Sequence, residues 1–312
     1  MTRRLLPVIA VLCLLAVPVS AAADDALEEM LQQAGEADFE GRGIVLSTWG
    51  GDSAAATYEI SRHEGMAMVK GAGVDLMLGS GIMATRSGTE WYGLEIDAWS
   101  EWDLSDRYSL SPPEPVRRLG RSARQMQVIE SDVTRARIVV DDESGVPLQA
   151  EIYDAEGRLF RMAVLVDFDS WQADATPMPT ADVMERSEMR PAASAGRLPA
   201  TAAWYLRADV YAGPGETIHA FYTDGLFSFS VFESDRAAAP DAFRTATSFT
   251  VDGEAYRRIV TPSQVWVYWN APDETYVLVG DLPPDHLEAV LPDLPEPGNR
   301  AFLVRLWRRL FG

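Results

Sequence analysis

The sequence is poor in the residues that most often build catalytic and metal sites. Its 312 residues include three histidines and one cysteine, Cys13, which lies in an N-terminal apolar run. If that run is removed on export, no thiol remains, which excludes cysteine catalysis, structural disulfides and thiolate metal sites. His63, His219 and His286 are far apart and show no paired ligand spacing, so we expect no metal site.

Positive charge is also scarce. The chain has 47 acidic side chains against 27 basic ones, a formal net charge of -20, and Lys70 is its single lysine. A surface this negative repels phosphate backbones, which argues against nucleic acid as the partner. The sequence contains no nucleophile elbow, no P-loop and no complete dinucleotide fingerprint. We therefore expect neither an enzyme nor a cofactor.

Residues 1–23 have the order of an export signal. Arg3 and Arg4 precede an apolar run from Leu5 to Val19, and small residues follow at 20–23. This order predicts cleavage near residues 21–23 and a mature chain outside the cytoplasm, in the periplasm where the host has one. The alternative is a retained membrane anchor, because the run is nearly long enough to span a bilayer.

The mature chain divides into two β-rich parts. Period-two alternation dominates residues 24–170 and returns in 200–298, whereas the Pro-rich stretch 171–199 indicates a linker. The clearest section, 133–168, predicts a three-stranded meander, and a proline predicts a short helix over 285–291. The expected fold class is α+β, mostly antiparallel β, with a smaller antiparallel sheet in the second part.

The first part carries enough large apolar side chains to line a ligand cavity. In the third meander strand five alternate positions are apolar, which predicts one continuous face, and four tryptophans add candidates. The candidate pocket residues are Trp49, Trp91, Trp99, Trp102, Phe160, Met162, Val164, Val166 and Phe168. A filled core between sheet and helix is the alternative explanation.

The C-terminal segment 299–312 differs from the rest of the chain. It holds four arginines and no acid, and its apolar residues share one helical face. A basic amphipathic helix with Trp and Phe suits a membrane surface, while docking on the protein's own acidic surface is the alternative. The candidate tail residues are Phe302, Leu303, Arg305, Trp307, Arg308, Arg309 and Phe311.

Three stretches resemble the RseB/MucB family of periplasmic regulators of the sigma-E envelope-stress response. They are DDESGVPLQAEIYDAEGRLFRMAVLVDFD at 141–169, YTDGLFSFSV at 222–231 and VLVGDLPP at 277–284. The first lies in the first part of the chain and the other two in the second, so the resemblance covers both parts.

The resemblance implies that residues 24–170 form an open β-barrel wrapped around helices, similar to the lipoprotein carriers LolA and LolB. It implies a non-enzymatic protein that binds the extracytoplasmic domain of a single-span anti-sigma factor and shields it from proteolysis. It also implies a lipid-like or lipopolysaccharide-like ligand in the first-part cavity that releases the partner. A periplasmic lipid or lipoprotein carrier that uses the same cavity is the alternative.

The second stretch also supplies a candidate partner surface. Its Asp-Gly pair predicts a hairpin, and aromatic side chains exposed on a hairpin make good anchors for a partner. The candidate partner-binding residues are Tyr222, Asp224, Gly225, Leu226, Phe227 and Phe229.

Overall fold

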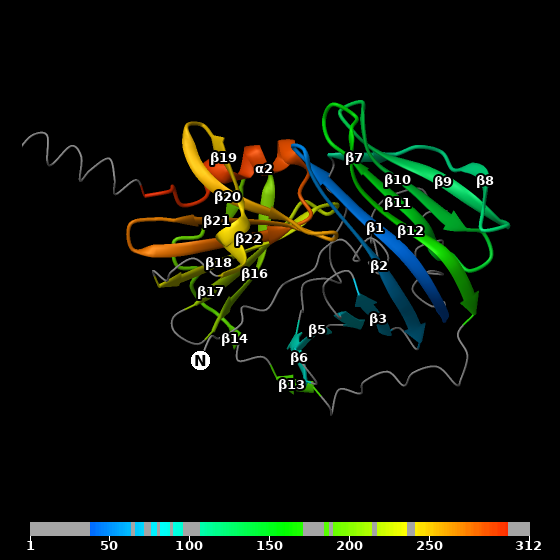
Figure 1. Ribbon diagram of the computed structural model, residues 1–312, viewed down its shortest axis with the longest axis horizontal. Helices are drawn as coiled ribbons and strands as arrows, with labels where there is room; N and C mark the ends of the chain where they lie inside the picture. Colours follow the sequence, from blue (N-terminus) through cyan, green and yellow to red (C-terminus); the bar gives the residue numbers. More distant parts are fainter. Residues whose placement is uncertain are drawn as a thin grey trace, which may run out of the picture.

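The computed structural model describes residues 38–63, 66–71, 76–79, 82–87, 90–95, 107–170, 184–186, 190–213, 217–235 and 241–298. Within these residues the chain forms a 13-stranded sheet and a 9-stranded sheet, which lie side by side (Figure 1). Of the described strand pairs, β6–β13 is the parallel one. The predicted fold class, α+β and mostly antiparallel β with a smaller antiparallel sheet in the second part, is confirmed.

The first sheet is built from the N-terminal half of the chain. Its strands follow the spatial order β13-β6-β5-β4-β3-β2-β1-β12-β11-β10-β9-β7, and β8 also pairs with β9. Their bounds are β1 (Phe39–Trp49), β2 (Asp52–His63), β3 (Met66–Gly71), β4 (Leu76–Gly79), β5 (Ile82–Ser87), β6 (Glu90–Glu95), β7 (Tyr108–Leu110), β8 (Glu114–Arg118), β9 (Arg121–Glu130), β10 (Val133–Asp141), β11 (Pro147–Tyr153), β12 (Leu159–Ser170) and β13 (Met184–Arg186). Since β1 pairs with β12, the predicted meander β10–β12 continues directly into the N-terminal hairpin.

The second sheet has the spatial order β14-β16-β17-β18-β22-β21-β20-β19, with β15 also paired to β16. Its strands are β14 (Arg190–Pro191), β15 (Thr201–Ala202), β16 (Tyr205–Ala212), β17 (Ile218–Thr223), β18 (Ser228–Asp235), β19 (Thr247–Val251), β20 (Glu254–Val260), β21 (Val265–Asn270) and β22 (Glu274–Gly280). The helices are η5 (Asp241–Thr245), α2 (Pro284–Val290) and η6 (Leu291–Asp293). The predicted short helix is confirmed as α2, which begins at Pro284 as expected of a proline at the first helical position.

The meander turns follow from local chemistry. Gly145 and Gly157 adopt left-handed φ values of 72° and 73°, which a residue without Cβ reaches at little cost. Asp141 holds the β10–β11 turn, because its Oδ2 accepts hydrogen bonds from the backbone N (2.9 Å) and Oγ (2.8 Å) of Ser144. The sequence pattern did not predict β7, β8 or β9, which precede the expected start of the meander at residue 133; β9 pairs with β10, and both β7 and β8 pair with β9.

A bulge divides β12. Its register against β1 shifts at Val166, which has no partner across the ladder. An extra residue reverses the side on which each later side chain emerges. Met162 and Val164 therefore emerge from one face of the sheet and Phe168 from the other, where its ring packs against Phe39 with 5.6 Å between centroids. The prediction that the alternate residues of this strand share one face through Phe168 is wrong.

Two apolar clusters join the sheets. Phe160 of the first sheet and Tyr205 of the second belong to one cluster, and Val45 and Val277 belong to the other. Each cluster therefore contains residues of both sheets. The division at 170 and 200 stays a prediction, and β13 and β14 lie inside the predicted linker. Among the described residues, no helix has the length and apolarity that a bilayer span requires.

Candidate functional site

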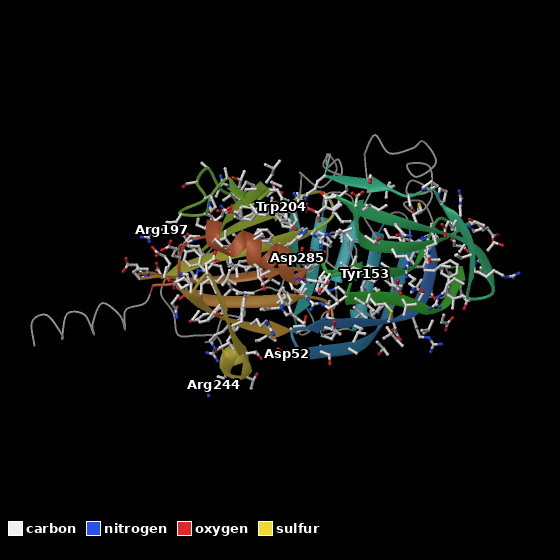
Figure 2. The ribbon with its side chains drawn as sticks, turned by 90° about the horizontal axis from the view of Figure 1, so that it is seen from above. Asp52, Tyr153, Arg197, Trp204, Arg244 and Asp285 are labelled. Atoms are coloured by element: carbon white, nitrogen blue, oxygen red, sulfur yellow. The ribbon has the colours of Figure 1, made fainter. Side chains whose placement is uncertain are left out.

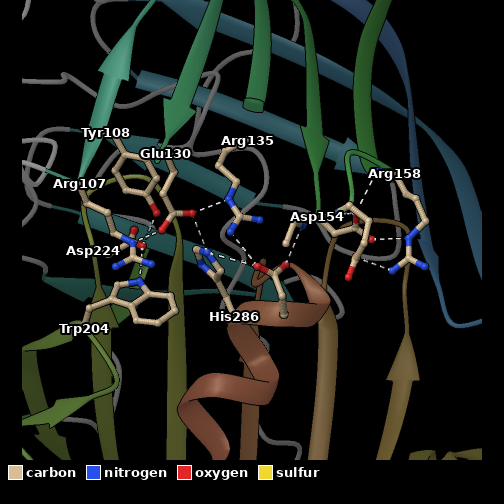
Figure 3. A network of polar contacts seen from close by, with 12 residues as sticks. Arg107, Tyr108, Glu130, Arg135, Asp154, Arg158, Trp204, Asp224 and His286 are labelled. Carbon is tan, nitrogen blue, oxygen red and sulfur yellow. Dashed lines mark hydrogen bonds and ion pairs between the residues drawn. The ribbon is translucent and has the colours of Figure 1, made fainter. Parts of the chain in front are cut away.

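The candidate site is the junction where the first sheet meets α2 and the loop between β17 and β18. Figure 3 shows α2 directed at the ends of the first-sheet strands, with a network of charged groups between them. Glu130, Arg135 and His286 are all less than a tenth exposed. Burying charge is costly unless each group is paired and hydrogen-bonded, so their partners decide what the junction is.

Glu130, the last residue of β9, binds three cationic or polar partners. Arg135 Nε donates to its Oε2 at 2.5 Å, Arg107 forms an ion pair with its Oε1, and His286 Nε2 lies 3.3 Å from Oε2. Burial works to raise its pKa, but the hydrogen bonds and charges of His286 and Arg135 outweigh burial. The pKa of Glu130 falls to about 2, so this carboxylate is ionised at neutral pH.

Arg135 ties the first sheet to the start of α2. Its Nη2 donates to Asp285 Oδ2 at 2.8 Å, and the other oxygen of Asp285 accepts the backbone N–H of Ala155 at 3.3 Å. The next helical residue, His286, lies with Nδ1 2.7 Å from the hydroxyl of Tyr205 in β16. The helix is therefore held by two different turns of the first sheet and by its own sheet.

The β17–β18 loop contributes a second polar centre. Asp224 Oδ2 accepts a hydrogen bond from the Tyr108 hydroxyl of β7 at 2.5 Å and from Trp204 Nε1 at 3.2 Å. Its Oδ1 accepts the backbone N–H groups of Leu226 (3.0 Å) and Phe227 (2.8 Å). Burial, together with the charge and hydrogen bond of Asp224, raises the pKa of Tyr108, so the hydroxyl keeps its proton and remains a donor.

The tip of the β1–β2 hairpin makes a further contact with the second sheet. Arg258 of β20 lies over the Trp49 ring, 5.5 Å from its centroid, and donates to the carbonyl of Trp49 at 3.4 Å. It also pairs with Asp52 at 3.3 Å. A Cβ at Gly50 would stand 2.6 Å from the Arg258 guanidinium, so the glycine permits this close approach.

A buried pair of opposite charges lies deeper in the junction. Burial lowers the pKa of Arg161 in β12 to about 10, and its Nε donates to Ser47 Oγ at 3.1 Å. Burial raises the pKa of Asp281 to about 6, against the opposing charge of Arg161. Asp281 Oδ1 accepts the backbone N–H of Ser228 at 2.8 Å and so fixes the start of β18.

The three family-like stretches converge on this junction. The first stretch supplies Ala155, the second supplies Asp224, and the third supplies Asp281 and leads directly into α2. Each acid here is engaged by an arginine, a hydroxyl or a backbone N–H. No group of three or more potential ligands is placed to hold a metal within the described ranges. The arrangement positions two sheets against one another.

Some predicted pocket residues belong to the junction. Trp49 and Phe160 pack edge to face with 6.3 Å between ring centroids, and both are buried in the cluster shared by the sheets. Met162 and Val164 lie opposite Leu46 and Ile44 of β1 on the other face. The cavity itself stays a prediction.

The other predicted pocket residues divide between the surface and the undescribed part of the chain. Val166 is half exposed, at 51%, as its place in the bulge requires. Trp91 belongs to β6, but its side chain lies outside the described residues, as do Trp99 and Trp102. The predicted tail, residues 299–312, lies outside them as well.

The predicted exposure of the hairpin aromatics is wrong. Tyr222, Phe227 and Phe229 are at most 1% exposed. Tyr222 stacks on Phe229 with 4.8 Å between centroids, and Phe227 packs edge to face with His286 at 5.1 Å. The loop fills the junction, and of the predicted partner-binding residues Gly225 and Leu226 keep partial exposure.

Sequence reasoning missed the charged residues of the junction. Arg135 alternates with apolar residues, a pattern that indicates the solvent-facing side of a strand, but it is buried against Glu130 and Asp285. The alternation of polar and apolar residues in β10 is the same whether the polar side of the strand faces water or a second sheet. The signal available was Arg161, which stands between the apolar residues Phe160 and Met162.

The geometry defines a class of protein: two mostly antiparallel sheets, the larger made by the N-terminal half, joined through a buried polar junction. The crystal structure of MucB is similar to this fold. It matches with a TM-score of 0.50 and 18% identity, over 88% of this chain and 98% of MucB. The chain therefore has an RseB/MucB-like fold, and the resemblance carried by its three stretches is confirmed at the level of fold.

Other comparisons give weaker matches. The Pseudomonas aeruginosa MucA/MucB complex structure matches with a TM-score of 0.45 at 18% identity, over 86% of this chain and 97% of that chain. A LolA superfamily protein from Nitrosomonas europaea, NE2245, matches with a TM-score of 0.22 at 9% identity, over 85% and 97%. No protein-family model and no curated protein matches the sequence.

Proposed function

We propose that the chain is an exported, non-enzymatic regulator that binds the extracytoplasmic domain of a single-span anti-sigma factor and shields it from proteolysis. The observation that carries the proposal is the MucB-like fold over 98% of MucB's length, together with the convergence of the three family-like stretches on one junction. The three stretches are distant in sequence, resemble one family and meet in space, and this convergence supports a common functional site.

We propose further that a lipid-like ligand binds the first sheet and releases the partner. Support comes from the face on which Met162 and Val164 lie opposite Leu46 and Ile44, since Ile44 is 38% exposed in a strand of otherwise well-covered apolar residues. Trp91, Trp99 and Trp102 remain proposed members of this surface. The basic segment 299–312 remains a proposed membrane contact.

The test is capture of purified anti-sigma extracytoplasmic domains by the chain lacking residues 1–23. We expect saturable binding with a Kd of about 1 μM or tighter, and slower proteolysis of the bound domain. The cytoplasmic domains of the same anti-sigma factors are the control. Adding lipopolysaccharide micelles should restore proteolysis. A chain that captures none of these domains, but carries extractable lipid and transfers it between vesicles, would instead be a lipid carrier.

A further inference from the structure

The two sheets protect most of their edges. An edge strand exposes unpaired backbone groups that invite another strand, and proteins block this with proline, charge or shortness. Here β14 has two residues and ends in Pro191, β8 contains Pro115 and three charged residues, and β7 and β13 have three residues each.

The strand β19 lacks proline and charge, and it is longer than β7, β13 and β14. Its five residues, TSFTV, include no charge and no proline, and no described strand pairs with its outer side. The strand is anchored from within, because Val251 is buried and the Arg258 guanidinium lies 5.4 Å from the Phe249 ring centroid. Figure 1 shows β19 at the margin of the second sheet, beside β20.

The register fixes which backbone groups are free. Asp252 and Gly253 form a two-residue turn with φ values of 50° and 85°, and Val251 pairs with Glu254. The residues that close such a turn exchange both hydrogen bonds, and hydrogen-bonded pairs then alternate along the ladder. The N–H and C=O groups of Ser248 and Thr250 therefore point away from β20, and both residues are exposed.

Charge along this edge is uneven. Arg257 lies opposite Ser248 in the ladder and has no ion-pair partner among the described residues; it donates to the carbonyl of Arg244 at 3.4 Å. Figure 2 shows Arg244 standing out from the body of the molecule. Asp252 and Glu254 lie at the opposite, turn end. The chain has a net charge of -20, so the Arg257 end of this edge is unusual in being basic. It favours an acidic residue on a ligand that binds at this edge.

We propose that the outer edge of β19 binds an extended segment of the partner protein as an added strand, with an acidic side chain of that segment near Arg257. The partner's identity rests on the proposed function. A strand of five residues is about 17 Å long. An edge that short buries far less than the roughly 1,200 Å² of a stable dimer, whereas a flexible segment can bind it and continue over neighbouring surface.

The test uses proline at a position where only the free edge needs the N–H. Thr250→Pro removes an outward-facing donor and leaves the β19–β20 hydrogen bonds in place, whereas Thr250→Val keeps the donor. We expect the Kd for the anti-sigma extracytoplasmic domain to rise about tenfold or more for Thr250→Pro and to be unchanged for Thr250→Val. Both variants should keep the wild-type urea midpoint; if Thr250→Pro does not, Ser248→Pro against Ser248→Val replaces the pair.

Residue-resolved hydrogen exchange gives a second readout on the unmodified chain. The amides of Ser248 and Thr250 should exchange fast in the free chain and become protected in the complex, while that of Phe249 is protected throughout. Capture without this protection, or capture undiminished by proline, overturns the edge proposal and leaves the proposed function standing. No capture by the wild-type chain overturns both. Protection that grows with protein concentration alone identifies a second copy as the occupant and also overturns it.

Discussion

The two Asp-Gly hairpins of the second sheet share a turn dipeptide and have opposite environments. In β17–β18, Asp224 is buried and accepts four hydrogen bonds, two of them from side chains outside the hairpin. In β19–β20, Asp252 is exposed at the turn of a hairpin that stands at the sheet margin. The dipeptide therefore specifies a reversal of the chain, and distant residues decide whether that reversal becomes a core or a surface.

The two hairpins also differ in their proposed roles. The buried hairpin holds the sheets together, since it meets Tyr108 of the first sheet and His286 of α2. In the exposed hairpin, the outward-facing N–H and C=O groups of Ser248 and Thr250 are proposed to bind a partner strand. If this comparison is right, equivalent substitutions in the two hairpins should have unequal effects.

The largest contrast is expected for the phenylalanines. Phe227→Ala should lower the free energy of unfolding by about 3–5 kcal/mol, because it opens a cavity beside Tyr108 and His286. Phe249→Ala should cost only about 1–2 kcal/mol, because that ring is partly exposed. Urea unfolding measures both, and equal losses would break the comparison.

The next contrast concerns pH. Asp281 has its pKa raised from 3.8 to about 6, so the folded chain holds a proton there that the unfolded chain releases. Its contribution to stability therefore grows as pH falls from 6 to 4. His219, in β17 of the buried hairpin, has its pKa lowered from 6.5 to about 3 by burial, so its contribution is lost as pH falls from 6.5 to 3. The two slopes oppose one another.

Removing one group should reveal the other. Asp281→Asn should lose up to about 3 kcal/mol of unfolding free energy relative to wild type between pH 6.5 and 4, from about 1.4 kcal/mol per pKa unit. His219→Gln should do the reverse and become relatively more stable toward pH 4. Urea unfolding at intervals across this range measures the slopes; parallel curves for all three chains would contradict the assignment.

The smallest contrast comes from one substitution made twice. Asp224→Asn replaces an acceptor with a donor opposite Tyr108 and Trp204, and should cost about 1–3 kcal/mol. Asp252→Asn should be neutral or stabilise by a few tenths of a kcal/mol, since Asn-Gly is the preferred pair in a turn with both φ values positive. Thermal unfolding resolves the difference, and a loss at Asp252 as large as that at Asp224 would count against it.

Much of the local structure was predictable because local patterns cause it. Alternation and turn glycines predicted the meander, and Pro284 predicted α2. The bulge at Val166 was not predictable, because the alternation of β12 reads the same with or without an extra residue; the partner strand sets the register.

The junction was unpredictable for a related reason. Arg135 and Asp285 are 150 residues apart, and Tyr108 and Asp224 are 116 apart. No local pattern records which of many acids a given arginine will meet. The aromatic residues of segment 222–229 were predicted to be exposed and are buried, since a residue that anchors a partner and one that anchors a second sheet look alike in sequence.

Both halves of the chain contribute charged groups to the buried junction, and this affects how binding should be mapped. Arg135 and Glu130 come from one half of the chain and Asp285 and His286 from the other. Truncation at residue 190 would separate these charged groups and leave each half with charges that have lost partners supplied by the other half. Loss of binding by a truncated half would then reflect the unfolding of that half. Point substitutions in the intact chain are therefore the better way to map binding.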